Sequence, residues 1–340
     1  MANVLLVGMG AVGSIAAYTL QRNGSVVSVV ARSAYDILTN EGFNLESCDY
    51  GNILNYKPNF VFKSISDAMK SKGPFDYIVI TTKNIPDIQP VENLIAPAFT
   101  KNTSIVLLEN GIGIERSMFK TFPDSIVISG VTLIGTTLYG KIVKHFSQDI
   151  VSFGPFINPN IEKGLQIEKA KEFTKLYSNE KNKIEYNENV KYFRWRKLIF
   201  NGAVNTTCAI TGVDSGRLDM FGGMHEVSVP AMKEIVEIAK ADGVELPNDI
   251  INFMVRLDDG EYAPPSMLID VRRNQYTEYK VLLGNALEIA REYGIKTPTC
   301  DILYHLCKVI QMRIMESHGK FVLPEKRPLI DENYQIQFKE

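Results

Sequence analysis

The strongest constraint on the fold lies in the first 24 residues of this 340-residue chain. Asn3–Val7 has the apolar character of a buried strand, and a helical pattern then runs through Arg22 and stops at Gly24. The glycine spacing between them permits a tight turn, close backbone approach to a pyrophosphate at the helix N-terminus, and close packing of helix on strand. The sequence therefore predicts a dinucleotide-binding turn. Its predicted cofactor contacts are Gly8, Met9, Gly10, Ala11, Val12 and Gly13.

Arg32 indicates which nicotinamide cofactor this turn would bind. It follows a second predicted strand, Ser25–Ala31, where a protein that prefers NAD usually carries an acidic residue that binds the ribose hydroxyls. A guanidinium suits a 2′-phosphate instead, because it donates bidentate, charge-assisted hydrogen bonds. We expect NADP(H) as the cofactor. The alternative is that Arg32 is a solvated surface residue.

Strands and helices alternate through the rest of the first half. Further strands are predicted at Tyr77–Thr81, Ser104–Leu108 and Ile126–Ser129, with helical segments at Ile88–Phe99 and Ile114–Phe119. This alternation is typical of a doubly wound parallel sheet.

Two polar residues follow strands of the predicted sheet. Ligands of such sheets bind beyond the carboxyl ends of the strands, which makes Lys83 and Asn110 candidate cofactor or substrate contacts. Lys83 could instead be a solvated lysine at a helix start. Asn110 could belong to an ordinary Asn-Gly turn.

The first domain is expected to end near Asn187–Asn189. Before that point, strand-like alternation occurs at Lys141–Phe146 and Ile150–Phe153, followed by a helix at about Glu162–Tyr177 and a last strand near Ile184–Tyr186. We therefore predict an N-terminal Rossmann-type domain at residues 1–188.

The second half is predicted to be helical almost throughout. Glycines just past three of the periodic segments favour helix ends there. The expected helices are 192–210, 224–241, 248–257, 266–293 and 299–318. This reading gives an all-helical domain at 189–322 and an irregular C-terminal tail at 323–340.

The segment Trp195–Asn205 places one cation and two carboxamides among apolar residues. Lys197, Asn201 and Asn205 stand at i, i+4 and i+8, so in an unbroken α-helix their side chains fall within a stripe about 80° wide. Polar groups are costly to bury without partners, which favours a wet or ligand-filled cavity beside this stripe. We interpret it as one wall of an active site.

A second polar series begins at the predicted helix start after Pro264-Pro265. The hydroxyl of Ser266 could cap the helix or meet a ligand carboxylate, and Asp270 and Glu278 would lie about 80° apart around a continuous helix. The alternative is a capping Ser, a structural Asp and a solvated Glu.

Composition favours small-molecule chemistry. The 37 basic and 39 acidic residues nearly cancel, so no global charge would recruit nucleic acid. The spacings of the four cysteines and four histidines predict neither a disulfide framework nor a metal site. The apolar N-terminus lacks the basic region of a signal peptide, and no segment has the pattern of a membrane span. We expect a soluble, cytoplasmic protein.

Five motifs in order resemble those of the ketopantoate reductase (2-dehydropantoate 2-reductase) family, from Asn3 to about Pro298. They are GMGAVG with Arg32, TTK with Lys83, ENGIG at 109–113, WRKLIFNGAVN at 195–205 and PSMLIDVRRNQYTE at 265–278. The resemblance implies NADPH-dependent reduction of a 2-oxo acid to a 2-hydroxy acid in a cleft between a Rossmann domain and a helical domain. For ketopantoate itself, that reaction belongs to pantothenate biosynthesis.

The resemblance also implies a role for each candidate residue. Lys197 matches the general acid, and Glu278 would contact the cofactor ribose and the substrate side of the site. The residues implied to contact substrate are Asn110, Asn201, Asn205 and Ser266. These roles suit the chemistry, because hydride transfer to a ketone needs a proton donor and hydrogen-bond donors near the oxygen.

Several positions depart from the family pattern. Glu109 replaces a common Gln, Tyr279-Lys280 follows Glu278 in place of an apolar residue and Asp, and Ala263 occupies a position that can supply a substrate-binding Asn. Ketopantoate is therefore the first expectation for the substrate, and another branched or aromatic 2-oxo acid is the second. A noncatalytic NADPH-sensing protein is a third reading. We expect a monomer or homodimer that contacts neither nucleic acid nor membrane.

Overall fold

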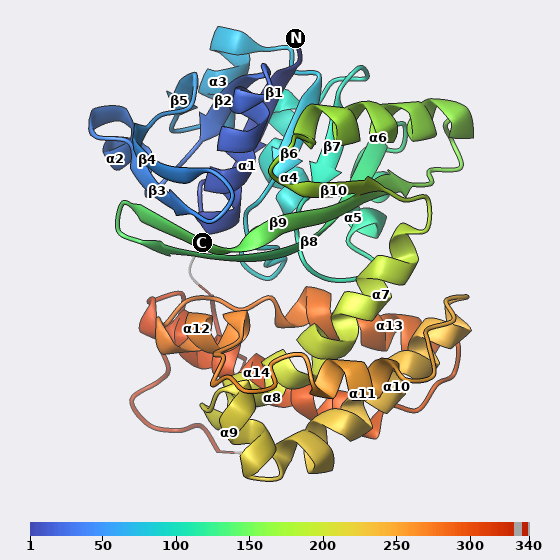
Figure 1. Cartoon of the computed structure of the whole chain (residues 1–340). Coiled ribbons are helices and arrows are strands. Elements are labelled where there is room, and N and C mark those ends of the chain that lie inside the picture. Colours follow the sequence, from blue (N-terminus) through green and yellow to red (C-terminus); the bar gives the residue numbers. More distant parts are fainter. Residues whose placement is uncertain (330–334, 339–340) are drawn as a thin grey trace. The chain divides into compact units, whose positions relative to one another are not determined.

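The computed structural model describes residues 1–329 and 335–338. The chain divides into two compact units, Met1–Arg194 and Trp195–Glu340 (Figure 1). The division falls inside helix α7 (Val190–Phe200), whereas the sequence analysis expects it between residues 188 and 189. The first unit contains a mixed sheet with helices and the second unit is helical, which confirms the predicted fold class.

The central strands of the first unit are parallel, as a doubly wound sheet requires. Strand β1 (Asn3–Val7) lies between β2 (Val26–Val30) and β6 (Tyr77–Ile80), and β7 (Ser104–Leu107) lies beside β6. Every residue of these strands is buried except the first residues of β1 and β2, which are half-buried. Such burial on both faces is typical of parallel strands and explains why their sequences are mainly apolar and do not alternate with polar residues.

The sheet extends beyond these strands in a way that the sequence analysis does not anticipate. Within the described residues the sheet has ten strands in all. The predicted strands Lys141–Phe146 and Ile150–Phe153 are one continuous strand, β9 (Ile142–Phe156), which pairs antiparallel with the similarly long β8 (Ile126–Tyr139). The polar residues between the two predicted segments stay in the strand because pairing within this long hairpin satisfies their backbone groups.

The segment between Arg32 and Tyr77 contains elements for which the sequence analysis makes no prediction. In strand β4 (Gly51–Tyr56), buried and exposed residues alternate little, because five of its six residues are exposed or half-buried. A strand of this kind carries no clear period-2 signal. The elements are α2 (Tyr35–Asn40), β3 (Phe43–Ser47), β4 (Gly51–Tyr56), β5 (Phe60–Phe62) and α3 (Ile65–Lys72).

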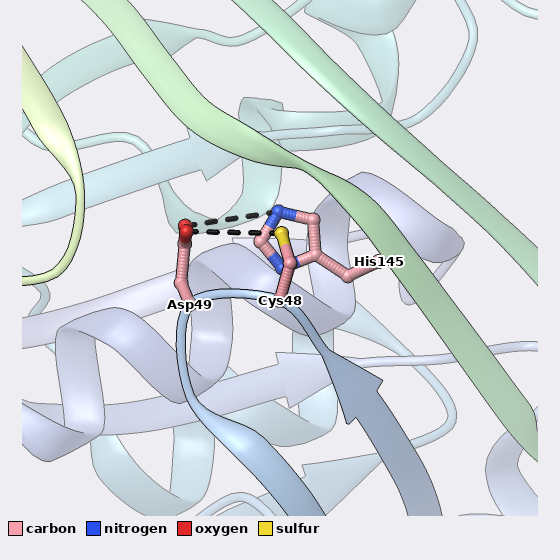
Figure 2. A group of neighbouring side chains, drawn as sticks. All are labelled: Cys48, Asp49 and His145. Atoms are coloured by element: carbon pink, nitrogen blue, oxygen red, sulfur yellow. Dashed lines mark hydrogen bonds and ion pairs between the residues drawn. The ribbon is translucent and has the colours of Figure 1, made fainter.

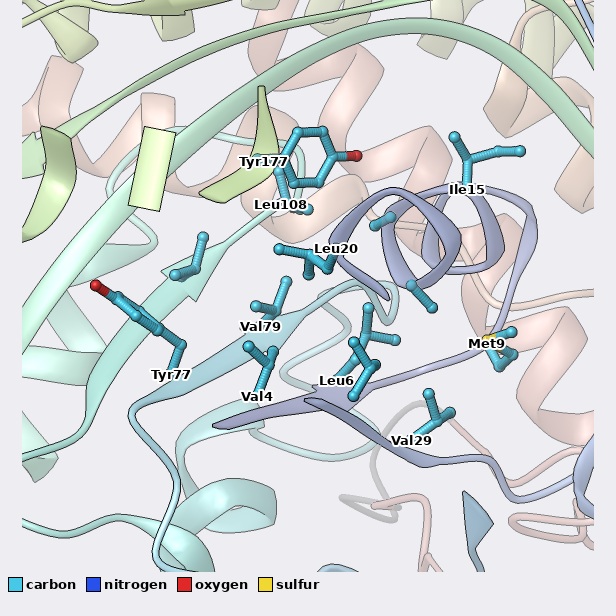
Figure 3. Close-up of a cluster of buried hydrophobic side chains, with 14 of the residues drawn as sticks. Val4, Leu6, Met9, Ile15, Leu20, Val29, Tyr77, Val79, Leu108 and Tyr177 are labelled. Carbon is cyan, nitrogen blue, oxygen red and sulfur yellow. The ribbon is translucent and has the colours of Figure 1, made fainter. Parts of the chain in front are cut away.

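Helices α1 (Ala11–Arg22) and α6 (Lys163–Tyr177) contribute to the apolar core of this unit. Ile15 and Leu20 of α1 lie in one buried cluster with Tyr177 of α6 and with sheet residues such as Val79 (Figure 3). The remaining elements are α4 (Val91–Ile95), a 3₁₀ turn at Ala96–Ala98, α5 (Glu115–Thr121) and β10 (Lys183–Tyr186).

The second unit consists of helices of 6 to 20 residues, several of them joined by π-helical turns. The predicted helix at 192–210 is α7, a π turn and α8, and the predicted helix at 224–241 is a second π turn followed by α10. The π turns are Asn201–Asn205, Met224–Ser228 and Lys280–Gly284. The helices after α7 are α8 (Thr206–Thr211), α9 (Ser215–Met220), α10 (Val229–Ala241), α11 (Ile250–Val255), α12 (Ser266–Arg272), α13 (Asn285–Glu292) and α14 (Pro298–Ser317).

The prediction of one helix over 266–293 is wrong. Helix α12 ends at Arg272, and Asn274 adopts a left-handed conformation with φ 53°. The N–H of Asn274 donates to Val271 O at 3.0 Å and that of Gln275 to Asp270 O at 2.8 Å, which is the Schellman pattern of a helix C-terminus. Helical structure resumes at Tyr279. The 80° separation expected for Asp270 and Glu278 therefore does not apply.

Residues 321–329 and 335–338 have no regular secondary structure, in agreement with the irregular tail. The rest of the predicted tail at 323–340 lies outside the described residues. Among the residues that the structure describes, no helix combines the length and the apolar character needed to cross a bilayer.

Candidate functional site

The candidate cofactor residues of the first unit follow strands that end side by side. Val7 pairs in register with Val30 of β2 and with Ile80 of β6, and Ile80 pairs with Leu107 of β7. Because these strands are parallel, the segments that follow them leave the sheet at one edge. These segments carry Gly8–Gly13, Arg32, Lys83 and Asn110.

The three glycines of the turn differ in their local surroundings. Gly8 has φ +101°, and a Cβ there would lie 2.8 Å from the Thr82 side chain. A Cβ on Gly13 would lie 2.4 Å from the carbonyl oxygen of Gly8, so helix α1 packs too closely for a side chain at that point. A Cβ on Gly10 would meet no atom within 4 Å. The backbone at Gly10 is therefore open to a ligand, and α1 begins there with no side-chain cap on its N-terminus.

The two basic candidates of the first unit are both exposed. Arg32 follows the end of β2, and its Nη1 donates to Gln89 Oε1 at 3.0 Å. Lys83 comes three residues after the end of β6. Exposed cations at this edge of the sheet are compatible with a phosphate-bearing ligand, and equally with the solvated roles considered above.

The loop that carries Asn110 is fixed by Arg194, a residue that the sequence analysis does not identify. Arg194 is 3% exposed, and its guanidinium donates to Glu109 O at 2.9 Å, to Gly111 O at 3.0 Å and to Leu107 O at 3.2 Å. A fourth hydrogen bond joins its Nε to Ser129 Oγ at 2.8 Å. Arg194 therefore satisfies the carbonyl groups on both sides of Asn110 and fixes that backbone.

Burial determines the electrostatics around Arg194. Loss of water lowers the pKa of its guanidinium to about 10, an effect opposed by the carboxylates of Glu115 and Glu109. Burial likewise raises the pKa of Glu115, while the Arg194 charge acts in the opposite direction. Arg194 remains a cation near neutral pH and continues to donate its hydrogen bonds.

Glu109, one of the departures from the family pattern, connects two loops of this edge. Its Oε2 accepts a hydrogen bond from Asn84 Nδ2 at 3.2 Å, and both side chains are buried. The segment that carries Lys83 is thereby tied to the segment that carries Asn110. A carboxylate performs this structural role as well as a carboxamide oxygen would.

In the second unit, the polar stripe Lys197, Asn201 and Asn205 passes from an α-helix into a π turn. Lys197 and Asn201 are half-buried, and Asn205 is 2% exposed. A π turn rotates less per residue than an α-helix, so the predicted width of 80° does not describe the part of the stripe after Asn201. Single π turns inside helices occur frequently at functional sites.

The structure brings two of the predicted substrate residues into direct contact. Asn205 Nδ2 donates to Ser266 Oγ at 3.0 Å, and Asn205 Oδ1 accepts from the backbone N–H of Met267 at 2.8 Å. Asn205 thus satisfies a free N–H at the start of α12. Ser266 is the first residue of α12 and makes no capping hydrogen bond, so the capping role considered for it is not observed.

Glu278 and Asp270 have different local settings. Both are 8% exposed, but Asp270 lies within α12 and Glu278 lies in the non-helical segment after it. Two hydrogen bonds fix the backbone at Glu278. The N–H of the preceding Thr277 donates to Gln311 Oε1 at 2.9 Å, and the carbonyl oxygen of Glu278 accepts from the N–H of Leu282 at 3.1 Å.

Comparison with protein families assigns the chain. The model of ketopantoate reductase PanE/ApbA matches residues 4–158, and the model of the C-terminal region of ketopantoate reductase PanE/ApbA matches residues 189–311. The chain belongs to the ketopantoate reductase family. Family membership indicates an oxidoreductase that acts on a 2-oxo acid.

Individual relatives and solved structures are similar to this chain over nearly its whole length. An uncharacterised protein of Saccharomyces cerevisiae is 36% identical and aligns with 98% of this chain and 100% of its own length. The crystal structure of 2-dehydropantoate 2-reductase from Methylococcus capsulatus is 28% identical, covers 92% of this chain and 97% of that one, and has a TM-score of 0.77. A ternary structure of D-mandelate dehydrogenase with NADH and anilino(oxo)acetate shares the fold, with 24% identity, a TM-score of 0.78 and coverage of 92% and 99%.

Arg194 was not identified as a structural residue of this ketopantoate reductase family member, although the sequence contains a signal for it. Arg194 precedes the buried Trp195 in a helix whose neighbouring residues are largely apolar. A cation in that setting requires acceptors, but the sequence does not say where they are. They lie 85 residues earlier in the chain, around Glu109.

Proposed function

We propose that this protein catalyses the NADPH-dependent reduction of a 2-oxo acid to the corresponding 2-hydroxy acid, with 2-dehydropantoate (ketopantoate) as the first candidate substrate. The observation that carries the proposal is the assembled pair of Asn205 and Ser266, in the same unit as Lys197, in a member of this family. The opening at Gly10 supports nucleotide binding by the first unit.

In this proposal Lys197 is the general acid. NADPH, when bound, supplies the hydride to the carbonyl carbon of the substrate. Negative charge then develops on the carbonyl oxygen, and the Lys197 ammonium donates a proton to it, which yields the 2-hydroxy acid. Lys197 regains its proton from solvent. Positioned acid catalysis of this kind contributes about 10²- to 10⁴-fold to the rate.

The carboxamide and hydroxyl groups are assigned to substrate binding. Asn110, Asn201 and Ser266 would bind the carboxylate and orient the carbonyl. Asn205 would act partly through Ser266, because its two amide atoms already contact Ser266 Oγ and Met267 N. Neutral donors position the substrate without introducing a second strong acid.

NADP(H) is the proposed cofactor, because Arg32 can pair with a 2′-phosphate. The glycine turn would contact the pyrophosphate, and Lys83 and Glu278 complete the assigned cofactor contacts. NADH is the alternative, and the D-mandelate dehydrogenase whose fold this chain shares was solved with NADH. The reaction and its product are the same with either cofactor.

Ala263 favours a second candidate substrate class, the larger branched or aromatic 2-oxo acids. The Ala263 carbonyl accepts hydrogen bonds from the backbone N–H of Ser215 at 3.1 Å and from Ser215 Oγ at 3.0 Å, so its backbone is fixed. A small apolar side chain on this fixed backbone replaces a potential hydrogen-bond donor and leaves room for a larger substrate group.

A panel of 2-oxo acids tests the proposal. Purified protein is mixed with NADPH, or with NADH in parallel, and loss of cofactor absorbance is followed for ketopantoate, branched and aromatic 2-oxo acids. We expect the highest kcat/KM with NADPH and ketopantoate. Preference for an aromatic acid would support the second class. Calorimetric binding of NADPH without turnover of any 2-oxo acid would contradict the proposal and favour a noncatalytic NADPH-binding protein.

A further inference from the structure

A cluster of Cys48, Asp49 and His145 lies in the first unit, away from the edge of the sheet that carries the glycine turn. Cys48 and Asp49 belong to the tight turn between β3 and β4, and His145 lies on β9 (Figure 2). Strands β3 and β9 are parallel, with Ser47 paired to His145, and Cys48 N donates to His145 O at 2.8 Å. Strand pairing therefore sets the position of the turn relative to the imidazole.

The three side chains converge at distances that suit a metal ion. His145 Nε2 lies 3.8 Å from Asp49 Oδ2, Cys48 Sγ lies 3.7 Å from Asp49 Oδ1, and one ligand atom from each residue lies within 4.8 Å of the others. Zinc bonds of about 2.0–2.3 Å in a tetrahedron place neighbouring ligand atoms about 3.3–3.8 Å apart. Only small rotations of these side chains would be needed to reach that geometry.

His145 provides a second, independent observation. The residue is 2% exposed, and its Nε2 has no hydrogen-bond partner among residues 1–329 and 335–338. Figure 2 shows that the imidazole is directed toward Asp49 and Cys48. A buried ring nitrogen without a partner is costly, and a metal ion would satisfy it.

Ser47 orients the imidazole from its other side. Ser47 Oγ lies 2.8 Å from His145 Nδ1 and also accepts the backbone N–H groups of Asp49 at 3.2 Å and Tyr50 at 3.0 Å. One hydroxyl thus fixes both the ring and the turn. Metal coordination at Nε2 requires the ring proton on Nδ1, where Ser47 Oγ would accept it.

We propose that Cys48, Asp49 and His145 form a Zn²⁺-binding site, in which Cys48 Sγ, one Asp49 oxygen and His145 Nε2 are the protein ligands and solvent completes the tetrahedron. The mixed set of sulfur, nitrogen and oxygen donors favours zinc over Mg²⁺ or Ca²⁺, which prefer oxygen ligands. The site is independent of the proposed reductase chemistry.

The charge around the cluster agrees with a cation. Asp49 also accepts the backbone N–H of Asp149 at 3.0 Å, and Asp149 is itself 1% exposed. Within the described part of the chain, no Lys or Arg forms an ion pair with either carboxylate. The Asp49 carboxylate therefore has no basic partner among these residues, and a divalent ion bound to it would neutralise its charge.

Protection of Cys48 from alkylation tests the site, because Cys48 is exposed and the other three cysteines are buried. Full-length protein is freed of metal with a chelator and treated with iodoacetamide in the presence of Zn²⁺ or of Mg²⁺. We expect Zn²⁺ to block labelling of Cys48 with one ion bound per chain, and Mg²⁺ to have no effect. Labelling at an unchanged rate under excess Zn²⁺ would overturn the proposal.

Co²⁺ in place of zinc reports the ligands directly. We expect a thiolate-to-cobalt charge-transfer band that is absent in Cys48→Ser and retained in Cys307→Ala, where a buried cysteine outside the cluster is changed. Asp49→Asn and His145→Gln are expected to weaken Zn²⁺ binding by more than about 100-fold, and Ser47→Ala by about 10- to 100-fold. Glu46→Gln removes a neighbouring exposed charge but no ligand, and should bind Zn²⁺ normally.

The isosteric variant Asp49→Asn keeps the test decisive if His145→Gln fails to fold. Circular dichroism of each metal-free variant separates misfolding from loss of binding. If Asp49→Asn binds Zn²⁺ as tightly as the parent protein, Asp49 is not a ligand and the three-residue site is refuted.

Discussion

The two units place their candidate residues by different means. In the first unit the important positions are set by backbone: the glycine turn is shaped by close approach of main-chain atoms, and Arg194 fixes the loop around Asn110 through three carbonyl groups. In the second unit side chains contact side chains, as in the pair of Asn205 and Ser266, and the helices that carry them are interrupted. On the proposed assignments, the nucleotide site would tolerate change at most side chains, whereas the proposed acid Lys197 and its neighbours would not.

The difference follows from what each half is proposed to bind. A pyrophosphate is recognised by backbone N–H groups at a helix N-terminus, for which small residues suffice. Proton transfer and carbonyl recognition need specific side chains at fixed positions. Single π turns aim such side chains in directions that a regular helix does not allow.

The largest expected effect is that of Lys197→Ala. We expect kcat to fall by about 10²- to 10⁴-fold with the preferred 2-oxo acid, because the proton donor is lost, while the Kd for NADPH measured by calorimetry changes little. Turnover near that of the parent protein would remove Lys197 from the mechanism. It would also contradict the view that the second unit depends on specific side chains and the first unit on its backbone.

Gly13→Ala tests the backbone side of the contrast. Its Cβ would lie 2.4 Å from Gly8 O and 2.5 Å from Thr81 Oγ1, so we expect a loss of about 2–3 kcal/mol in the free energy of unfolding, measured by urea denaturation. Gly10→Ala is the matched control, because its Cβ meets no atom within 4 Å. That variant should keep its stability and lose affinity for the dinucleotide. Equal effects of the two substitutions on stability would contradict the packing argument.

Arg32→Asp tests whether Arg32, in the first unit, determines the preference for NADPH over NADH. Loss of charge-assisted hydrogen bonds to a 2′-phosphate corresponds to roughly 1.5–3 kcal/mol, so the ratio of kcat/KM for NADPH to that for NADH should fall by about 10- to 100-fold. The measurement compares both cofactors at saturating 2-oxo acid. An unchanged ratio would mean that Arg32 is only a solvated residue.

Asn205→Ala has the smallest expected effect, but it tests how the second unit is built. The variant leaves Met267 N without its side-chain acceptor and Ser266 Oγ without its donor, and we expect a loss of about 1–2 kcal/mol in the free energy of unfolding. Asn201→Ala is the comparison, since Asn201 is half-buried and should affect KM more than stability. If both variants are fully stable, Asn205 does not organise α12.

Elements whose signals are local could be predicted from the sequence. The strand, turn and helix at Asn3–Arg22 depend on neighbouring residues, and they are observed as expected. The helix predicted over 266–293 fails because a single residue, Asn274, adopts a left-handed conformation that an apolar periodicity cannot reveal. The weakly patterned strand β4 is missed for a similar reason.

Contacts between distant segments could not be predicted from the residues alone. Arg194 finds its acceptors 85 residues away, and Ser47 lies beside His145 across 98 residues. Lys197 and Glu278 were identified as candidates from the spacing of polar residues, and their proposed roles come from the resemblance to the family. The structure adds the partners that a motif omits, as it does for Asn205.

The hydrogen bonds of Asn205 restrict how this protein could change its substrate. Asn205 holds the start of α12, so if it also contacts the substrate as proposed, it cannot be varied for the substrate without cost to that helix end. Libraries aimed at new 2-oxo acids should therefore leave Asn205 unchanged and diversify Asn201 and Ala263. This constraint suggests an order of events in evolution. New substrate preferences would arise first at Asn201 and Ala263, and Asn205 would change only in a chain that had gained stability elsewhere.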